Sequence, residues 1–277
     1  MLVNEGDLSV AKACTVVGLS RRAWYREDPV NEQLERDALV IDELNSLVDK
    51  HPRWGFWKYF YALRLAGHPW NHKRVWRIYC AMKFNKKRRV KRRLLDRVKT
   101  PLDSPSLPNH TWSFDFMSDT LYSGHRYRVL NIIDEGTREA LDISIATSLP
   151  AGRVVRVLDA LVAEHGKPRR IRVDNGAEMT STAFVEWCER HKIQIVYIQP
   201  GKPNQNAYIE RFNRSFRHEV LDANLFRTLS EVREIAWAWQ ISYNEERPHA
   251  ALGNVPPTEF KRLLKAGNSI NQLCALR

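Results

Sequence analysis

The stretch TWSFDFM at residues 111–117 places aromatic side chains at alternate positions. Because successive side chains of a β-strand point to opposite faces, the three aromatic residues share one face and Asp115 lies on the other. A carboxylate within an aromatic strand is costly to bury unless it is paired or bound to a metal ion. The stretch therefore predicts a strand that belongs to the core and carries a functional acid.

Downstream of this strand, strand and helix patterns alternate. Further strands are expected at residues 127–133, 141–146, 170–173 and 193–198, and helices at about 153–165, 182–191, 206–221 and 229–244. Thr228 and Glu231 fit a capping box at the start of the last helix. Successive strands followed by alternating helix and strand predict an α/β domain, in which helices cover both faces of a mixed five-stranded sheet.

Two further acids stand at positions that suit a common site. Asp174 closes its strand directly before the turn signal Asn175-Gly176, so its carboxylate should project from the end of the sheet. Glu210 follows after 35 residues, on a helix whose same sector carries Arg214 and Arg217. Carboxylates from strands and a helix make an oxygen-rich site suited to Mg²⁺. A pair of such ions is a common device for phosphodiester chemistry.

Other readings compete with this one. Glu210 taken alone would be an ordinary Glu–Arg pair on a helix surface. Asp119, Asp134 and Glu178 also lie near the expected strands, and we interpret each as a turn or surface residue, with Asp134 the strongest competitor. The nine His residues show no ligand pairing, which argues against a zinc site.

Charge is distributed unevenly along the chain. Residues 1–108 carry 22 Lys and Arg against 12 Asp and Glu, whereas the remainder carries 22 against 20. Ten of the basic residues fall within residues 83–99, and a stretch with three Pro residues, 100–110, follows. This distribution predicts a polyanion-binding module, joined by a DNA-tracking linker to an enzyme-sized domain.

The basic N-terminal part reads as helical. Residues 8–25 predict one short helix pair, and residues 57–67 with 71–82 predict another, with Ser20 and Asn71 as N-caps. Both pairs have the outline of a helix-turn-helix, whose second helix would present basic side chains to a DNA groove. Two ordinary helical hairpins remain the alternative.

The cysteine positions and the hydropathy of the chain indicate the cellular compartment to expect. Cys14, Cys80, Cys188 and Cys274 are scattered without paired spacing, which argues against a disulfide framework and a zinc knuckle. No stretch approaches 18 uncharged apolar residues, and the N-terminus lacks a signal-peptide core. We therefore expect a cytoplasmic protein without membrane contact.

The motifs resemble a known family. WSFDF at 112–116, VDNG at 173–176 and PGKPNQNAYIERFN at 200–213 occur in order, followed by YN at 243–244, RPH at 247–249 and LG at 252–253. In these motifs the chain is similar to the transposases encoded by the second reading frame of many bacterial insertion sequences, whose catalytic core is related to retroviral integrases. The resemblance runs from about Leu8 to Phe260. Met179 stands where relatives usually have an aromatic residue, and the His/Cys zinc module of retroviral integrases is lacking.

The resemblance implies a ribonuclease-H-like fold preceded by a small helical region, with Asp115, Asp174 and Glu210 as the catalytic and metal-binding acids. It implies metal-dependent DNA cleavage and strand transfer with two Mg²⁺ ions per active site, for which Mn²⁺ can substitute. The expected partners are the terminal inverted repeats of the element, target DNA, further copies of the chain on DNA, and the first-reading-frame product. The expected location is the bacterial nucleoid.

The division of the chain follows from these readings. We expect a helix-turn-helix region at 1–82, a basic linker at 83–108, an integrase catalytic core at 109–265 and a tail at 266–277. The rival functions are a nuclease of the same fold that does not join DNA, and a non-catalytic DNA-binding regulator from a decayed element. Residues expected to contact DNA are Arg217, Arg214, Lys202, Asn206, Arg21, Arg22, Lys73, Arg74, Lys86, Lys87, Arg88 and Arg89.

Overall fold

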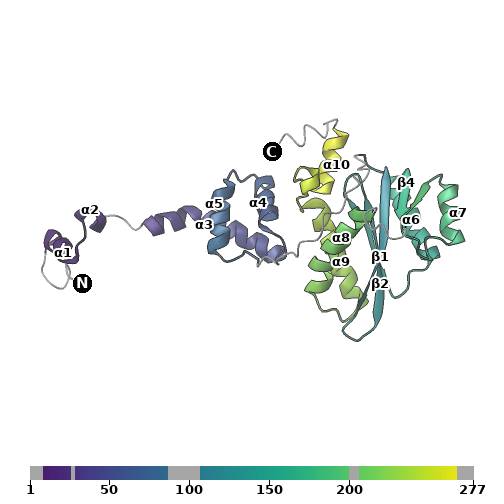
Figure 1. The fold of residues 1–277 in the computed structure, drawn as a ribbon, viewed down its shortest axis with the longest axis horizontal. Helices are drawn as coiled ribbons and strands as arrows, with labels where there is room; N and C mark the ends of the chain where they lie inside the picture. Colours follow the sequence, from purple (N-terminus) through teal and green to yellow (C-terminus); the bar gives the residue numbers. More distant parts are fainter. Residues whose placement is uncertain (1–8, 26–28, 87–106, 200–205, 267–277) are drawn as a thin grey trace. The chain divides into compact units, whose positions relative to one another are not determined.

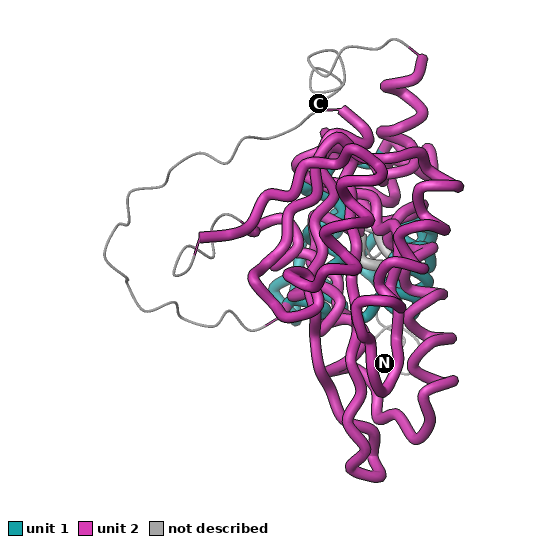
Figure 2. Tube along the Cα trace, turned by 90° about the vertical axis from the view of Figure 1, so that its right-hand side faces the viewer, with its two compact units in different colours: residues 1–52, 70–85 teal, residues 53–69, 86–277 magenta. Residues whose placement is uncertain are grey.

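The computed structural model describes residues 9–25, 29–86, 107–199 and 206–266. Contacts within the chain define two compact units (Figure 2). The first comprises residues 1–52 and 70–85, and the second comprises residues 53–69 and 86–277. The four-part division expected from the sequence stays a prediction. No helix in the described ranges is long and apolar enough to cross a membrane.

The first unit is helical. Its helices include α1 (Val10–Val17), α2 (Arg21–Trp24), α3 (Pro29–Lys50) and α5 (His72–Ala81). The Ser20 hydroxyl accepts a hydrogen bond from the Ala23 amide at 3.1 Å, and the Asn71 side chain accepts one from Lys73 at 2.8 Å. Both predicted N-caps are thereby confirmed, because each satisfies an amide that the first turn leaves unpaired.

Helix α3 was not predicted from the sequence, yet it forms the core of the first unit with α5. Val40 and Leu44 are fully buried. Asp37 is buried beside them and accepts hydrogen bonds from Arg74 at 2.9 Å and from Arg77 at 2.6 Å. Burial alone would raise the pKa of the Asp37 carboxyl, but these hydrogen bonds and the two positive charges hold it below its usual value.

The second unit contains the sheet. Its strands are β1 (Thr111–Thr120), β2 (Arg126–Asp134), β3 (Ala140–Ala146), β4 (Arg170–Val173) and β5 (Gln194–Tyr197). Its helices include α4 (Phe56–Leu65), α6 (Ala151–His165), α7 (Thr182–Arg190), α8 (Ala207–Glu219), α9 (Leu229–Glu245) and α10 (Pro257–Lys265), with short turns η2 (Leu221–Ala223) and η3 (Ala250–Leu252).

The strand order is β3-β2-β1-β4-β5. Strands β1, β2 and β3 pair in antiparallel fashion, and β4 and β5 extend the sheet in parallel with β1. This mixed five-stranded sheet confirms the predicted fold class. Helix α10 was not predicted, and β1 runs three residues beyond the expected end at residue 117.

Helices cover both faces of the sheet, with α6 and α7 on one side and α8 and α9 on the other (Figure 1). Trp112 and Phe114 of β1 are buried in the cluster that includes residues of α6 and α7. Met117 belongs to the other cluster, with Phe212 and Phe216 of α8. The alternation predicted for β1 is thus confirmed, and Asp115 lies on the face that α8 covers.

The apolar stripe of α8 anchors the second cluster, and we expect it to be needed for folding. Phe216 is fully buried, so Phe216→Ala should lower the free energy of unfolding by about 3–5 kcal/mol, from lost apolar burial and the cavity left behind. Urea unfolding followed by circular dichroism measures this. Trp237→Ala is the matched control, because Trp237 on α9 is 65% exposed and should change stability little. Equal losses in the two variants would contradict the packing described here.

Candidate functional site

Asp115 is the centre of the candidate site. One of its carboxylate oxygens accepts the Phe116 amide at 2.9 Å, and the other accepts the side-chain amide of Asn213 on α8 at 2.8 Å. Burial raises the pKa of Asp115 to about 6. Within that value, the negative charges of Asp174 and Glu210 act in the same direction as burial, and the two hydrogen bonds act against it. The structure therefore brings the three predicted acids within electrostatic reach of one another.

Asp174 and Glu210 approach Asp115 from neighbouring elements. Asp174 follows the last residue of β4, which lies beside β1 in the sheet, and its side chain is exposed. Its carboxylate accepts the amide of Gly176 at 3.1 Å, and a Cβ added at Gly176 would lie only 3.0 Å from this oxygen. Because Gly176 has no side chain, the Asp174 carboxylate can lie against this turn without a steric clash. Glu210 lies in the first turn of α8 and is half-buried.

A chain of two asparagines orients Asp115, and the sequence reading missed it. Asn131 is fully buried on β2, directly opposite Asp115 in the strand register. Its amide nitrogen donates to the side-chain oxygen of Asn213 at 2.7 Å, so the nitrogen of Asn213 is left to donate to Asp115. The one available signal was the spacing of Asn213, three residues after Glu210 and hence on the same helical face.

The competing acids have structural partners. Asp134 is buried and accepts three backbone amides, from Asn109, Gly136 and Thr137, so it organises the turn that follows β2. This confirms it as a turn residue, although it is not exposed. Glu178 forms an ion pair with Arg128, and Asp119 forms one with Arg217 at 3.3 Å.

The predicted DNA-contacting residues differ in their surroundings. Lys202, Lys87, Arg88 and Arg89 lie outside the described residues. Arg21, Arg22, Lys73, Lys86 and Arg214 are exposed. The other three are engaged within the protein: Arg74 pairs with Asp37, Arg217 pairs with Asp119, and Asn206 is buried at the start of α8. DNA contact by any of these residues stays a prediction.

The C-terminal motif residues hold the elements of the candidate site together. Arg247 forms a buried ion pair with Glu219 at the end of α8, and Glu219 also accepts a hydrogen bond from the Trp239 ring at 3.0 Å. The Asn244 side chain accepts from the backbone amide of Ala140 at 2.8 Å and donates to its carbonyl at 2.9 Å. These contacts hold α9 and the chain after it against α8 and β3.

No three His, Cys, Asp or Glu side chains within the described ranges converge closely enough to hold one metal ion together. The donor set nevertheless suits hard divalent cations, because carboxylate oxygens are their usual protein ligands. The pKa of Asp115 is raised by burial first and also by the charges of Asp174 and Glu210, and bound cations would offset that repulsion.

The charge crowding predicts how Asp115 titrates in metal-free protein. Asp174→Asn removes one of the two neighbouring charges, so the pKa of Asp115 should fall from about 6 towards its ordinary value of 3.8. Carbon-detected NMR of the carboxyl group measures this. Asp159→Asn on α6, on the opposite face of the sheet, is the control and should leave the titration unchanged.

The raised pKa of Asp115 also predicts how the free energy of unfolding depends on pH. Because the pKa of Asp115 is raised in the folded state, its contribution to stability is fully present below about pH 3.8 and is lost as the pH rises through 6. Asp174→Asn should therefore stabilise metal-free protein at pH 8 and not at pH 3.5. A gain that is equal at both values would show that the effect does not act through Asp115.

Comparison with known proteins gives family matches over this region. Models described as "Integrase core domain" match residues 105–203 and 191–257. A protein of insertion element IS476 from Xanthomonas euvesicatoria is 38% identical over 97% of this chain and 78% of its own length. A protein of insertion element IS407 from Burkholderia multivorans is 36% identical over 92% of this chain and 91% of its own length.

More distant matches agree with these. The transposase for insertion sequence element IS904 from Lactococcus lactis is 26% identical over 84% of this chain and 97% of its own length. Among solved structures, a chain of the simian T-cell lymphotropic virus intasome in complex with PP2A regulatory subunit B56 gamma superposes with a TM-score of 0.50. That match covers 72% of this chain and 70% of the other at 17% identity, and it shows a shared fold.

Proposed function

Because the chain belongs to the bacterial insertion-sequence transposases with an integrase core domain, we propose that Asp115, Asp174 and Glu210 form the site at which it cleaves and joins DNA strands. DNA transposition, by polynucleotidyl transfer, is the function of this family. The observation that supports the site is the raised pKa of Asp115, whose causes include the charges of the other two acids.

Two Mg²⁺ ions are the proposed cofactors, with Mn²⁺ as a substitute. When bound, they would supply Lewis-acid stabilisation of the attacking and leaving oxygens during phosphodiester exchange. Asp115, Asp174 and Glu210 are the residues that would hold these ions through their carboxylate oxygens. Water and DNA phosphate would complete the coordination.

The protein side chains position the carboxylates and the DNA. Asn213 holds one oxygen of Asp115, and Asn131 fixes the orientation of the Asn213 amide. Arg214, exposed one helical turn after Glu210, is placed to contact a phosphate close to the acids. Water or a DNA 3′-hydroxyl attacks the phosphodiester, so no side chain of the protein is assigned as the nucleophile.

The proposed partners follow from the reaction. Transposition processes two ends of an element and joins them to target DNA, so we propose that further copies of the chain assemble on the terminal inverted repeats. The first-reading-frame product of the element is a proposed additional partner. The place of action is the DNA of the bacterial nucleoid.

Strand cleavage and joining on labelled DNA that carries the element's own ends tests the proposal. With Mg²⁺, the wild type should give nicked ends and joined products, and EDTA should abolish both. Asp174→Asn and Glu210→Gln should each lower strand transfer by at least about a thousandfold, since each removes a metal ligand. DNA binding should remain within about threefold of wild type, because neither acid is expected to contact DNA directly.

Glu186→Gln is the matched control, because Glu186 is exposed on α7, on the opposite face of the sheet. It should retain joining. Cleavage without joining by the wild type would favour the nuclease, and binding without any chemistry would favour the DNA-binding regulator. Retained joining by Asp174→Asn would remove that residue from the site.

A further inference from the structure

Helix α8 presents a second polar face, away from the acids. At about 100° per residue, Tyr208, Arg211 and Ser215 point roughly 130° away from Glu210 around the helix axis. The buried stripe of Ile209, Phe212 and Phe216 occupies the remaining sector. The helix therefore has one face in the core, one beside Asp115, and one that borders a pocket.

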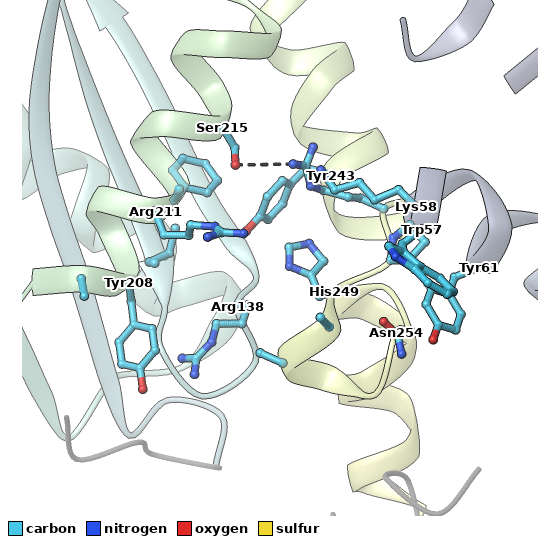
Figure 3. Close-up of a pocket in the computed structure, with 17 residues that line it drawn as sticks. Trp57, Lys58, Tyr61, Arg138, Tyr208, Arg211, Ser215, Tyr243, His249 and Asn254 are labelled. Carbon is cyan, nitrogen blue, oxygen red and sulfur yellow. Dashed lines mark hydrogen bonds between the residues drawn. The ribbon is translucent and has the colours of Figure 1, made fainter. Parts of the chain in front are cut away.

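The pocket has a volume of about 660 Å³ and lies within the second unit (Figure 3). Its cations are Lys58, Arg138, Arg211 and Arg247, and its aromatic residues include Trp57, Tyr61, Tyr208 and Tyr243. No Asp or Glu is among the 17 described residues that line it. Aromatic rings together with several cations suit a ligand that is both planar and anionic.

One wall of the pocket is held in an uncommon conformation. Arg138, in the turn between β2 and β3, has a φ of 60°, which side-chain-bearing residues rarely adopt. Its guanidinium carbon lies 3.7 Å from the centroid of the Tyr208 ring. Backbone strain of this kind persists where the surrounding structure enforces it, and such positions cluster at binding sites.

The His249 ring, which lines the pocket, offers a defined hydrogen-bonding group (Figure 3). One ring nitrogen bonds to the backbone of Tyr243, and Nε2 is shielded from solvent without a partner among the described residues. Burial first, and then the charges of Arg247, Lys58 and Arg138, hold the pKa of His249 well below 6.5. The ring is therefore neutral, and Nε2 is an acceptor when Nδ1 donates to the Tyr243 carbonyl.

Several cations lie close together in this pocket. Glu219 at the edge of the pocket serves both Arg247 and Lys58, and its oxygen lies 3.6 Å from the Lys58 nitrogen. Burial lowers the pKa of Lys58 to about 8, and the charge of Arg247 adds to this. Arg211 is exposed and has no ion-pair partner in the described part of the chain.

A second hollow of about 540 Å³ lies next to the pocket, along α8 from Arg211 to Glu219. It shares Lys58, Arg211, Ser215 and Arg247 with the pocket, and its other lining residues include Arg214, Arg217 and the acids Glu219 and Asp222. A continuous row of cations therefore runs from the side of α8 beside Glu210 to the pocket. Several neighbouring cations of this kind suit the repeated phosphates of a nucleic-acid backbone.

We propose that this pocket, on the face of α8 turned away from the acids, binds an unpaired nucleotide of the DNA on which the protein acts. The base lies against the aromatic side chains, with an exocyclic amine within reach of His249. The adjoining phosphates lie along Arg211 and Arg214. The identity of the polymer as DNA rests on the proposed function, whereas the preference for an unpaired nucleotide rests on the pocket alone.

Binding measured in EDTA tests this, because it requires no catalysis. The probes are a blunt duplex of an element end and the same duplex with a short unpaired extension, added to either strand. The wild type should bind one extended duplex about tenfold more tightly than the blunt one, the scale of stacking one base on an aromatic side chain. Arg211→Gln and Tyr208→Leu should abolish this preference and change blunt-duplex affinity by less than about threefold.

Matched controls separate the pocket from general charge and aromatic content. Arg156→Gln on α6 removes an exposed cation, and Tyr122→Leu removes a tyrosine that is 78% exposed, and both should keep the preference. Asp174→Asn should also keep it. Loss of strand transfer with the preference intact would thus count against the proposed catalytic site only, and not against the pocket.

Three results of the binding assay would overturn the proposal. The first is equal binding of both duplexes by the wild type. The second is an equal loss of both affinities in the pocket variants, which would indicate a contact with the duplex. The third is no change of either affinity in the variants, which would favour an acidic protein segment as the occupant. Photo-crosslinking the wild type through a halogenated base in the extension gives an independent readout. The crosslinked peptide should contain Trp57, Tyr61 or Tyr208, and crosslinks confined to other peptides would also overturn the proposal.

Discussion

The cost of placing a carboxylate inside the sheet shapes the rest of the second unit. Asp115 is on the central strand, and the aromatic residues on either side of it face the core beneath α6 and α7. Asp115 points to the other side of β1, so its polar partners must come from the elements packed on that side. Helix α8 supplies one of them, Asn213. Without such partners a buried carboxylate would be costly, so the position of α8 and the chemistry of Asp115 depend on each other.

Helix α8 meets three demands at once because its sectors are separated around its axis. Its apolar stripe packs on the sheet, Glu210 and Asn213 reach Asp115, and Tyr208 and Arg211 border the basic pocket. A rotation of the helix that improved one contact would disturb the other two. The buried pair between Arg247 and Glu219 restrains such a rotation at the end of the helix.

Much of the second unit could be predicted from the sequence because its signals are local. Strand alternation located Asp115, the Asn175-Gly176 turn located the end of β4, and helical spacing located Glu210. Helix α3, of 22 residues, was not predicted, although Asp28-Pro29 and Pro52 mark its two ends in the sequence. Asn131 was also missed, since its role depends on the register of β2 against β1 and on contact with α8, which no local pattern contains.

The distribution of ion pairs explains how an acidic site persists in a basic protein. Arg217 lies on the same side of α8 as Glu210, yet it pairs with Asp119. Arg247 is likewise engaged by Glu219. If these guanidinium groups paired with the three acids instead, the pKa of Asp115 would be lowered, whereas it is raised to about 6. Because these two guanidinium groups pair with Asp119 and Glu219, they leave the oxygens of Asp115, Asp174 and Glu210 available to cations, while Arg211 and Arg214 remain exposed for phosphate.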